Sequence, residues 1–288
     1  VDMAGNVETS HTVGFAVLPP SATFTPLGGA SRIETALQVS RSNFALNSVA
    51  TVVIASSDTW PDALVGSSLA GAYRSPILLT RPGTLSAGLS AEIARLGASK
   101  AVSLGGTTAV GTGGEASLTS LLGAGNVRRI GGSDRYATAR MVAAETVAFY
   151  GCNYNGTAFV TTGLNFPDAL AAGPLASAKG WPIYLVRPSG LTAANGNAMI
   201  ASGVTKALVL GSTAAAPAVV SDDVVNMVGA TVMRLQGADR YATAVSIATY
   251  GVANAGLSWN GVAVATGENF PDGLSAGAAQ GHNGSVLL

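Results

Sequence analysis

The chain repeats one two-part signature three times, at a spacing of about 104 residues. The first part, Arg-Tyr/Ile-x-Thr-Ala, begins at Arg32, Arg135 and Arg240. The second part, an aromatic residue followed by Pro-Asp, comes about thirty residues later and places its carboxyl groups at Asp62, Asp168 and Asp272. A period this long exceeds the roughly 20–50 residues of solenoid and propeller repeats. We therefore expect each copy to fold as a domain with its own core.

The repeats divide most of the chain into three copies, the last of them shortened. The expected copies span residues 23–126, 127–231 and 232–288. The pattern of the third copy stops about halfway, at Leu288, so we expect the sequence to be a fragment. Before the repeats, Val13, Phe15 and Val17 alternate with small residues and two prolines follow. This favours a strand and a linker, and residues 1–22 resemble the tail of a bacterial immunoglobulin-like surface domain.

Helix and strand signals alternate within each copy. Asp134 is a predicted N-cap, and Ser31 with Glu34 forms a capping box at the matching place in the first copy. The Pro-Asp motif places Pro in the first turn of a second helix. Further helices are predicted at 87–96 and 193–201, and strands at 51–55, 76–79, 101–104, 158–161, 182–185, 207–210 and 262–265. Parallel strands need helical crossovers, so each copy is predicted to be an α/β sandwich with a mostly parallel sheet.

Composition excludes several classes of protein. Although 48% of the residues are apolar, no apolar run approaches eighteen residues, so we expect no membrane insertion. The formal net charge is zero, which removes the electrostatic basis for binding nucleic acid or an anionic membrane. One thiol, Cys152, and two distant histidines, His11 and His282, cannot form an internal disulfide or a metal cluster. We therefore predict no cofactor and no metal.

The chain also lacks a convincing enzyme signature. The residues Gly273, Ser275 and Gly277 match the Gly-x-Ser-x-Gly pattern of a nucleophile elbow. They follow the Pro-Asp motif inside a predicted helix, however, and not at the strand-to-helix turn that exposes a nucleophile. No P-loop and no His-Glu-x-x-His helix occurs. We therefore expect that this segment is not an enzyme and has no catalytic residue.

Four motifs in a fixed order make the chain resemble the cell-wall-binding repeat 2 family of Gram-positive surface proteins. They are Arg-Tyr-x-Thr-Ala, Asn-Phe-Pro-Asp-Ala/Gly-Leu, Pro-Ile-Leu-Leu and Leu-Gly-Gly, and the resemblance covers residues 23–288. It implies three Toprim-like or Rossmann-like copies around a pseudo-threefold axis. It also implies secretion to the cell surface, where the copies bind an anionic cell-wall polysaccharide as a non-covalent anchor while any catalysis lies in other domains.

The resemblance points to one apolar element in anchoring. In the first two copies this Ile-Leu-Leu element corresponds to Ile77, Leu78, Leu79, Ile183, Tyr184 and Leu185, and in the third copy to residues 286–288. Tyr184 departs from the pattern, although a tyrosine could stack on a sugar ring. The alternative is that these residues form a buried central strand, because burial alone explains their apolar character.

The repeated charges allow two interpretations. The arginines and aspartates both precede or open helices, so the predicted topology places them at the carboxyl edge of each sheet, where open α/β sheets bind ligands. Arg32, Arg135 and Arg240 would then hold phosphate or carboxylate groups of a polymer. Alternatively, they pair with Asp62, Asp168 and Asp272 and tie the copies together. Asn165 and Asn269, next to the Pro-Asp motif, would bond a hydroxylated ligand or cap a turn.

Three functions remain open on the sequence alone. The first is a wall anchor whose several weak sites act together. The second is the targeting region of a peptidoglycan hydrolase, an N-acetylmuramoyl-L-alanine amidase or a peptidase, whose catalytic domain lies elsewhere. The third is a surface-layer or adhesin segment that binds other surface proteins. All three place the chain outside the cell, at the cell wall.

Overall fold

The structure is a computed structural model and describes residues 23–288, so the expected immunoglobulin-like tail at 1–22 lies outside the described part. The first unit consists of α1 (Arg32–Asn43), β1 (Thr51–Ser56), α2 (Pro61–Ala72), β2 (Ile77–Thr80), α3 (Ala87–Arg95), β3 (Lys100–Leu104), α4 (Thr112–Leu122) and β4 (Val127–Ile130). The second unit consists of α5 (Arg135–Tyr150), η1 (Gly151–Asn153), β5 (Thr157–Thr162), α6 (Pro167–Leu170), α7 (Gly173–Lys179), β6 (Ile183–Val186), α8 (Ala193–Ala201), β7 (Lys206–Leu210), α9 (Ala218–Asp223), η2 (Val224–Val228) and β8 (Thr231–Leu235). The third unit consists of α10 (Arg240–Ala255), β9 (Ser258–Ala263), α11 (Pro271–His282) and β10 (Ser285–Leu287).

All strand pairs between these elements are parallel. The first sheet has the order β2-β1-β3-β4, the second has the equivalent order β6-β5-β7-β8, and the third unit has the pair β10-β9. Helices connect the strands throughout. The predicted α/β fold with parallel sheets is therefore confirmed.

The last strand of each complete sheet lies beyond the copy boundary that the repeats suggest. β4 pairs with β3, with Leu104 opposite Ile130, and β8 pairs with β7, with Leu210 opposite Leu235. The boundaries at 126/127 and 231/232 therefore separate each sheet from nearly all of its edge strand. An edge strand pairs with one neighbour only, and for β4 and β8 this neighbour is the preceding strand, β3 or β7. Each edge strand therefore belongs to the sheet of the preceding copy, although the repeat pattern assigns it to the next one.

The helix starts follow the predicted capping chemistry. The Ser31 hydroxyl accepts a hydrogen bond from the Glu34 amide at 3.3 Å, and the Asp134 carboxylate accepts one from the Ala137 amide at 2.7 Å. The Pro-Asp motifs open α2, α6 and α11, as expected. In the second unit this helix is divided into α6 and α7 near Pro174, because proline has no N–H to continue the helical hydrogen bonds.

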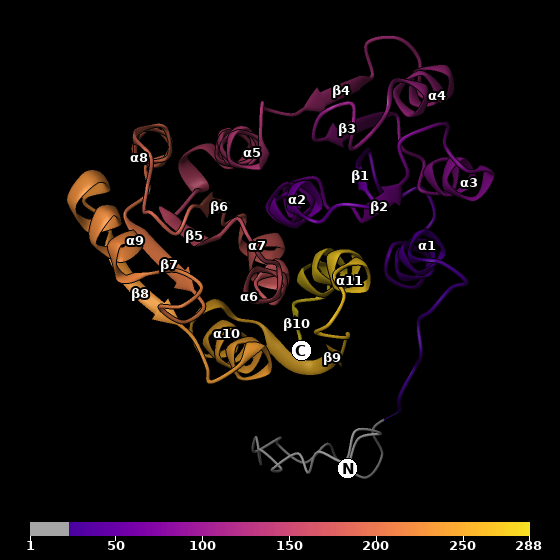
Figure 1. The fold of residues 1–288 in the computed structure, drawn as a ribbon. Helices are drawn as coiled ribbons and strands as arrows, with labels where there is room; N and C mark the ends of the chain where they lie inside the picture. Colours follow the sequence, from indigo (N-terminus) through magenta and orange to yellow (C-terminus); the bar gives the residue numbers. More distant parts are fainter. Residues whose placement is uncertain (1–22) are drawn as a thin grey trace, which may run out of the picture.

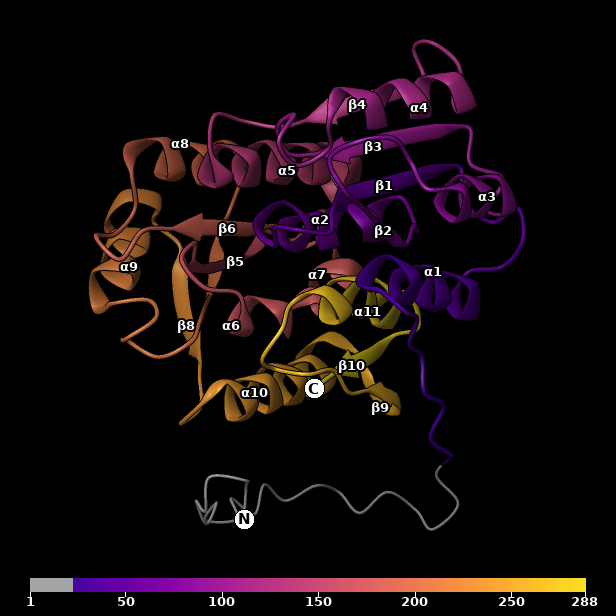
Figure 2. The same ribbon diagram turned by 45° about the vertical axis from the view of Figure 1, so that its right-hand side comes forward.

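The three units surround a central group of helices. α2, α7 and α11 contact one another, and Figure 1 shows them nearly end-on with the sheets around them. Small residues permit the close contact: a Cβ added at Gly173 would lie 3.0 Å from the Cα of Gly277. α1 of the first unit packs against α11 of the third, which Figure 2 shows from the side. The units therefore form a closed, pseudo-threefold ring.

The hydrophobic core is partly shared between units. Strand residues alternate in direction: Ile77 and Leu79 join one central cluster that contains residues of all three units, whereas Leu78 faces a second cluster, made of first-unit residues and Ala279 of the third unit. Phe159 and Tyr184 divide in the same way in the second unit. The expectation of a separate core in each copy is therefore wrong for the inner faces, because each sheet is covered on that side by helices of neighbouring units as well as its own.

Candidate functional site

Three aromatic side chains meet where the central helices begin. Trp60, Phe166 and Phe270 are the N-cap residues of α2, α6 and α11. The ring centroids of Trp60 and Phe166 are 6.3 Å apart, and those of Phe166 and Phe270 are 5.8 Å apart. All three rings are half-buried against the shared core. This aromatic triad joins the three units at one end of the molecule's axis.

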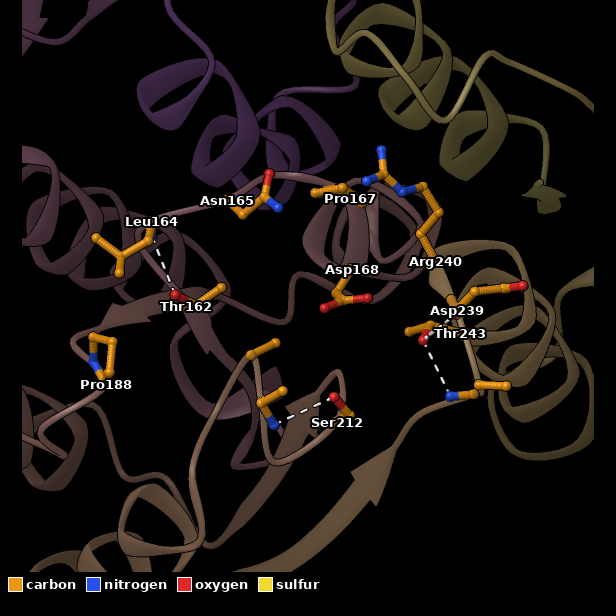
Figure 3. Close-up of a pocket in the computed structure, with 14 residues that line it drawn as sticks. Thr162, Leu164, Asn165, Pro167, Asp168, Pro188, Ser212, Asp239, Arg240 and Thr243 are labelled. Atoms are coloured by element: carbon orange, nitrogen blue, oxygen red, sulfur yellow. Dashed lines mark hydrogen bonds between the residues drawn. The ribbon is translucent and has the colours of Figure 1, made fainter. Parts of the chain in front are cut away.

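The repeated arginines surround the aromatic triad, and we call them the arginine ring. Arg135 of the second unit stacks on Trp60 of the first, with its guanidinium carbon 5.2 Å from the ring centroid. Arg32 of the first unit lies over Phe270 of the third at 5.6 Å. Contacts of this kind are cation–π interactions. Two arginines of the ring thus stack on an aromatic ring of a neighbouring unit, and the third, Arg240, extends toward Pro167 of the second unit (Figure 3).

One N–H of each guanidinium is used to position it. The Nη1 atoms donate to carbonyl oxygens of the loops after β1, β5 and β9, namely those of Ser57 (2.7 Å from Arg32), Gly163 (2.7 Å from Arg135) and Gly267 (2.6 Å from Arg240). All three arginines are exposed. A guanidinium has five N–H donors, so further donors of the arginine ring can bind an anion from solvent.

The first repeated aspartate faces the next unit. Asp62 lies against Gly105, where an added Cβ would be 2.8 Å from the carboxyl carbon. Gly105 has a φ of 87°, so the turn after β3 favours glycine for conformational reasons as well. Burial raises the pKa of Asp62, while the side chain of Thr138 and the charge of Arg135, both from the second unit, act in the opposite direction.

The second aspartate repeats this arrangement toward the third unit. Burial raises the pKa of Asp168, and this effect is opposed by the side chain of Thr243 and by the charge of Arg240. Asp272 is half-buried in the first turn of α11. Among residues 23–288, no ion pair within 4.0 Å joins a member of the arginine ring to one of these aspartates. The attraction between Arg and Asp is therefore longer-ranged than a direct salt bridge.

A cavity of about 330 Å³ lies at the carboxyl edge of the second sheet, between the second and third units. Its lining includes residues that end or follow the four strands, namely Thr162, Pro188, Ser212 and Gly237. Figure 3 shows the Asp168 carboxylate pointing into this space, while the Arg240 side chain extends toward Pro167. Both repeated charges are thus at the edge where open α/β sheets bind ligands.

The two asparagines lie in corresponding loops but have different contacts. Asn165 lines the cavity, and its Oδ1 accepts a hydrogen bond from the amide of Phe166 at 2.9 Å. Asn165 therefore caps the turn before the Pro-Asp helix. Asn269 is exposed in the loop before α11. Its amide can reach a ligand from solvent.

The Ile-Leu-Leu element is not part of this site. All six of its side chains in the first two units are buried, with at most 1% of their surface exposed. Tyr184 is fully buried, and its hydroxyl donates to the Ser202 hydroxyl at 2.8 Å. Tyr184 therefore cannot stack on a sugar in this structure. The element contributes to the sheets, as the alternative interpretation of a buried strand expected.

Comparison with known proteins identifies the repeats. A family model described as Cell wall binding domain 2 (CWB2) matches residues 27–115, 129–225 and 234–288. The chain belongs to this family. It is therefore a cell-wall-binding region of three CWB2 copies, in agreement with the family that its motifs resemble.

Curated relatives extend over most of the CWB2 copies. The chain is 29% identical over 249 residues to the N-acetylmuramoyl-L-alanine amidase LytC of Bacillus subtilis (strain 168), which is 86% of this chain and 46% of the amidase. It is 30% identical over 263 residues to the Amidase enhancer of the same organism, which is 90% of this chain and 34% of that protein. The chain thus spans less than half the length of these two relatives.

Solved structures share the fold. Cwp6 from Clostridium difficile superposes with a TM-score of 0.80 at 24% identity, over 91% of this chain and 40% of Cwp6. Cwp8 from the same organism superposes with a TM-score of 0.79 at 25% identity, over 91% of this chain and 44% of Cwp8. The fold of this chain is therefore shared with parts of these two proteins.

The match to a nucleophile elbow has a structural explanation within the third CWB2 copy. Ser275 lies inside α11, only 2% of its surface is exposed, and its hydroxyl donates to the carbonyl oxygen of Asp272 at 3.2 Å. The prediction that this motif lies in a helix is confirmed. Within residues 23–288, no three His, Cys, Asp or Glu side chains are placed to hold a metal ion, and no helix is long and apolar enough to cross a bilayer.

The aromatic triad was not predicted as a site. Its sequence signal is the aromatic residue that precedes Pro-Asp in every copy, at Trp60, Phe166 and Phe270. This signal indicates a shared role, but it does not reveal that the three rings meet. That contact depends on the closure of the three CWB2 copies into a ring.

Proposed function

We propose that the CWB2 copies anchor a bacterial surface protein to the wall by holding an anionic secondary cell-wall polysaccharide at the arginine ring. The observation that carries this proposal is that one exposed arginine of each copy lies at the end of the molecule where the aromatic triad is found. Arg32 and Arg135 stack on rings of the triad, and Arg240 extends toward Pro167, the residue after Phe166 (Figure 3). A guanidinium pairs with phosphate or carboxylate through parallel N–H donors. Three such contacts on one polymer give an avidity that exceeds the affinity of any one of them.

The same residues support a second role for the site, as a tie between copies. Arg135 stacks on Trp60 across the boundary between the first two units, and its charge acts on the half-buried Asp62. The side chain of Thr138, also from the second unit, lowers the pKa of the same carboxyl group. The two roles predict different effects of removing the Arg135 side chain. If Arg135 holds the polymer, polymer binding is lost first; if it ties the copies together, the stability of the ring is lost first.

The wider context of the segment is also a proposal. The names of two relatives, an amidase and an amidase enhancer, favour a targeting region for wall remodelling in a larger secreted protein. More than half of each relative lies outside the matched length, so we expect any catalytic activity to belong to other regions. We assign no catalytic step to the CWB2 copies.

The experiment that tests the anchor is co-sedimentation with purified Gram-positive cell wall. We expect the 288-residue chain to bind intact wall, to bind less at high ionic strength, and not to bind wall stripped of its anionic polymer. Arg135→Ala should weaken binding about tenfold, because it removes one charge-assisted hydrogen bond to the polymer. The melting temperature of this variant should change little. Lys100→Ala is the control, because Lys100 is an exposed cation at the opposite, amino-terminal end of β3.

Several results would contradict the proposal. Equal retention by stripped wall would exclude the polymer as the ligand. A lower melting temperature of Arg135→Ala with unchanged wall binding would favour the tie between copies instead. Assembly that depends on protein concentration and occurs without wall would favour the surface-layer or adhesin function. Release of peptidoglycan fragments by the segment alone would show that it is an enzyme.

A further inference from the structure

A second, larger cavity lies at the other end of the central helices. Its volume is about 500 Å³, which is in the range of small-molecule sites. The lining comes from the C-terminal parts of α2, α5, α7 and α11, and so from all three units. The aromatic triad and the arginine ring lie at the N-terminal ends of α2, α6 and α11, so the two sites are separate.

Arg74 in this cavity has a backbone conformation that the other two copies adopt at a glycine. Its φ is 50°, whereas the equivalent residues just after the other central helices are Gly180, with a φ of 64°, and Gly284, with a φ of 67°. A side chain in this left-handed region costs free energy that glycine avoids. Within residues 23–288, no side-chain hydrogen bond or ion pair of Arg74 compensates for this cost. Such strain is typical of functional positions.

His282 is a second copy-specific residue of the same cavity. Its equivalents in the other units are Ala72 and Ala178, which also line the space but carry no polar group. The imidazole stacks on Phe44, with ring centroids 4.5 Å apart, which fixes its orientation. Burial lowers the pKa of His282, and the nearby charge of Arg74 lowers it further. Arg74 and His282 therefore line the same cavity from the first and the third unit.

The remaining lining suits a sugar. None of the described residues that line the cavity is an aspartate or a glutamate, so the charge of Arg74 is not neutralised there. Tyr150 contributes a hydroxyl group, and Phe149 has 56% of its surface exposed and can cover the apolar face of a ring. Ser75 and Ser177 also line the cavity and add polar groups to it.

We propose that this axial cavity binds a single sugar unit that carries one anionic group, a carboxylate or a phosphate. Arg74 pairs with the anionic group through its planar fork of donors, and His282 and Tyr150 contact the same end of the ligand. The exposed ring of Phe149 selects for the sugar ring. The site occurs once in the three copies, because only the first copy has an arginine and only the third has a histidine at these positions.

The test is a titration of the 288-residue chain with four probes: D-glucuronate, glucose 6-phosphate, glucose and inorganic phosphate. Calorimetry measures affinity, and the ring resonances of His282 report the place of binding. We expect glucuronate or glucose 6-phosphate to bind with a dissociation constant in the millimolar range, as for a ligand of this size. Glucose and inorganic phosphate should bind at least tenfold more weakly. Comparison of glucuronate with glucose 6-phosphate identifies the anionic group.

Two substitutions at one position separate binding from structure. Arg74→Gln keeps the side-chain Cβ and the strain, and should weaken binding at least tenfold, whereas Lys100→Gln should leave it unchanged. Arg74→Gly matches the sister copies, so it should abolish binding while raising the melting temperature by about 2 °C. A purely structural arginine would give a lower melting temperature instead.

Three outcomes would overturn the axial site. They are glucose binding as tightly as glucuronate and glucose 6-phosphate, unchanged binding by Arg74→Gln, and a destabilised Arg74→Gly. Arg135→Ala should leave the titration with small sugars unaltered. Failure of this inference is therefore distinguishable from failure of the proposed wall anchor.

Discussion

Replacement of Gly71 by alanine tests the central contact between the first two units. Gly71 lies near the end of α2, where this helix meets α7. A Cβ at this position would lie 2.5 Å from the carbonyl carbon of Ser177 and 2.6 Å from its Cα, and still closer to its carbonyl oxygen. These are backbone atoms of a helix, so they cannot rotate away as a flexible side chain can. The two helices would have to separate.

The size of the effect follows from two opposing contributions. Alanine is favoured over glycine within a helix by about 0.5–1 kcal/mol. Overpacking of a well-packed interior costs about 1–3 kcal/mol, and contact with rigid backbone points to the upper end of this range. We therefore expect Gly71→Ala to lower the free energy of unfolding by about 2 kcal/mol. In a chain of this length the melting temperature should fall by about 4–8 °C.

The matched control is Gly113→Ala in α4. A Cβ there would have its nearest neighbour, the carbonyl carbon of Gly83, at 3.4 Å, which is an ordinary contact. This variant should be as stable as the parent chain or slightly more stable. Calorimetry of the two variants side by side measures the difference. If Gly71→Ala melts at or above the temperature of Gly113→Ala, α2 and α7 do not meet as described.

Three further predictions concern the site and its surroundings. Tyr184→Phe should cost about 1 kcal/mol in chemical denaturation, because it removes the buried hydrogen bond to Ser202, and should leave wall binding unchanged; weaker wall binding would return the Ile-Leu-Leu element to the site. Burial raises the folded-state pKa of Asp62, so ionisation of this carboxyl group opposes folding above its ordinary pKa. Asp62→Asn should therefore melt at a higher temperature than the parent chain at pH 7 but not at pH 3. If the difference in melting temperature between variant and parent is the same at both pH values, Asp62 has an ordinary pKa. Ser275→Ala should change neither wall binding nor any hydrolytic activity of the full-length protein, and a loss of hydrolysis would make Ser275 a nucleophile after all.

Local signals in the sequence predicted many of the helices and strands, but not the helices α4 and α9 or the edge strands β4 and β8. Capping residues such as Ser31 and Asp134 mark helix starts because their side chains satisfy backbone N–H groups within the same turn. The unbroken apolar strands indicate burial on both faces, and this is why the parallel sheets could be predicted. The division of the second Pro-Asp helix near Pro174 was not predicted, although an interior proline is a known cause of such a break.

Contacts between the copies could not be predicted in this way. An inward residue such as Leu79 has the same apolar character whether its neighbour belongs to its own copy or to another. The repeated Arg and Asp residues were correctly expected at one edge of the sheets, but their partners depend on which units are adjacent. Arg135 lies on Trp60 because the second unit follows the first around the axis. The order of the units around the axis cannot be predicted from the periodicity of the residues.

The contact of α1 with α11 limits how this architecture can evolve. In open arrays each repeat touches only its sequence neighbours, so duplication or loss of a repeat changes length but leaves the other interfaces intact. Here the first and third units occupy each other's free surface, and a fourth unit would have no place within this ring. Copy number is thus fixed by geometry, and diversification must proceed by substitution inside individual units.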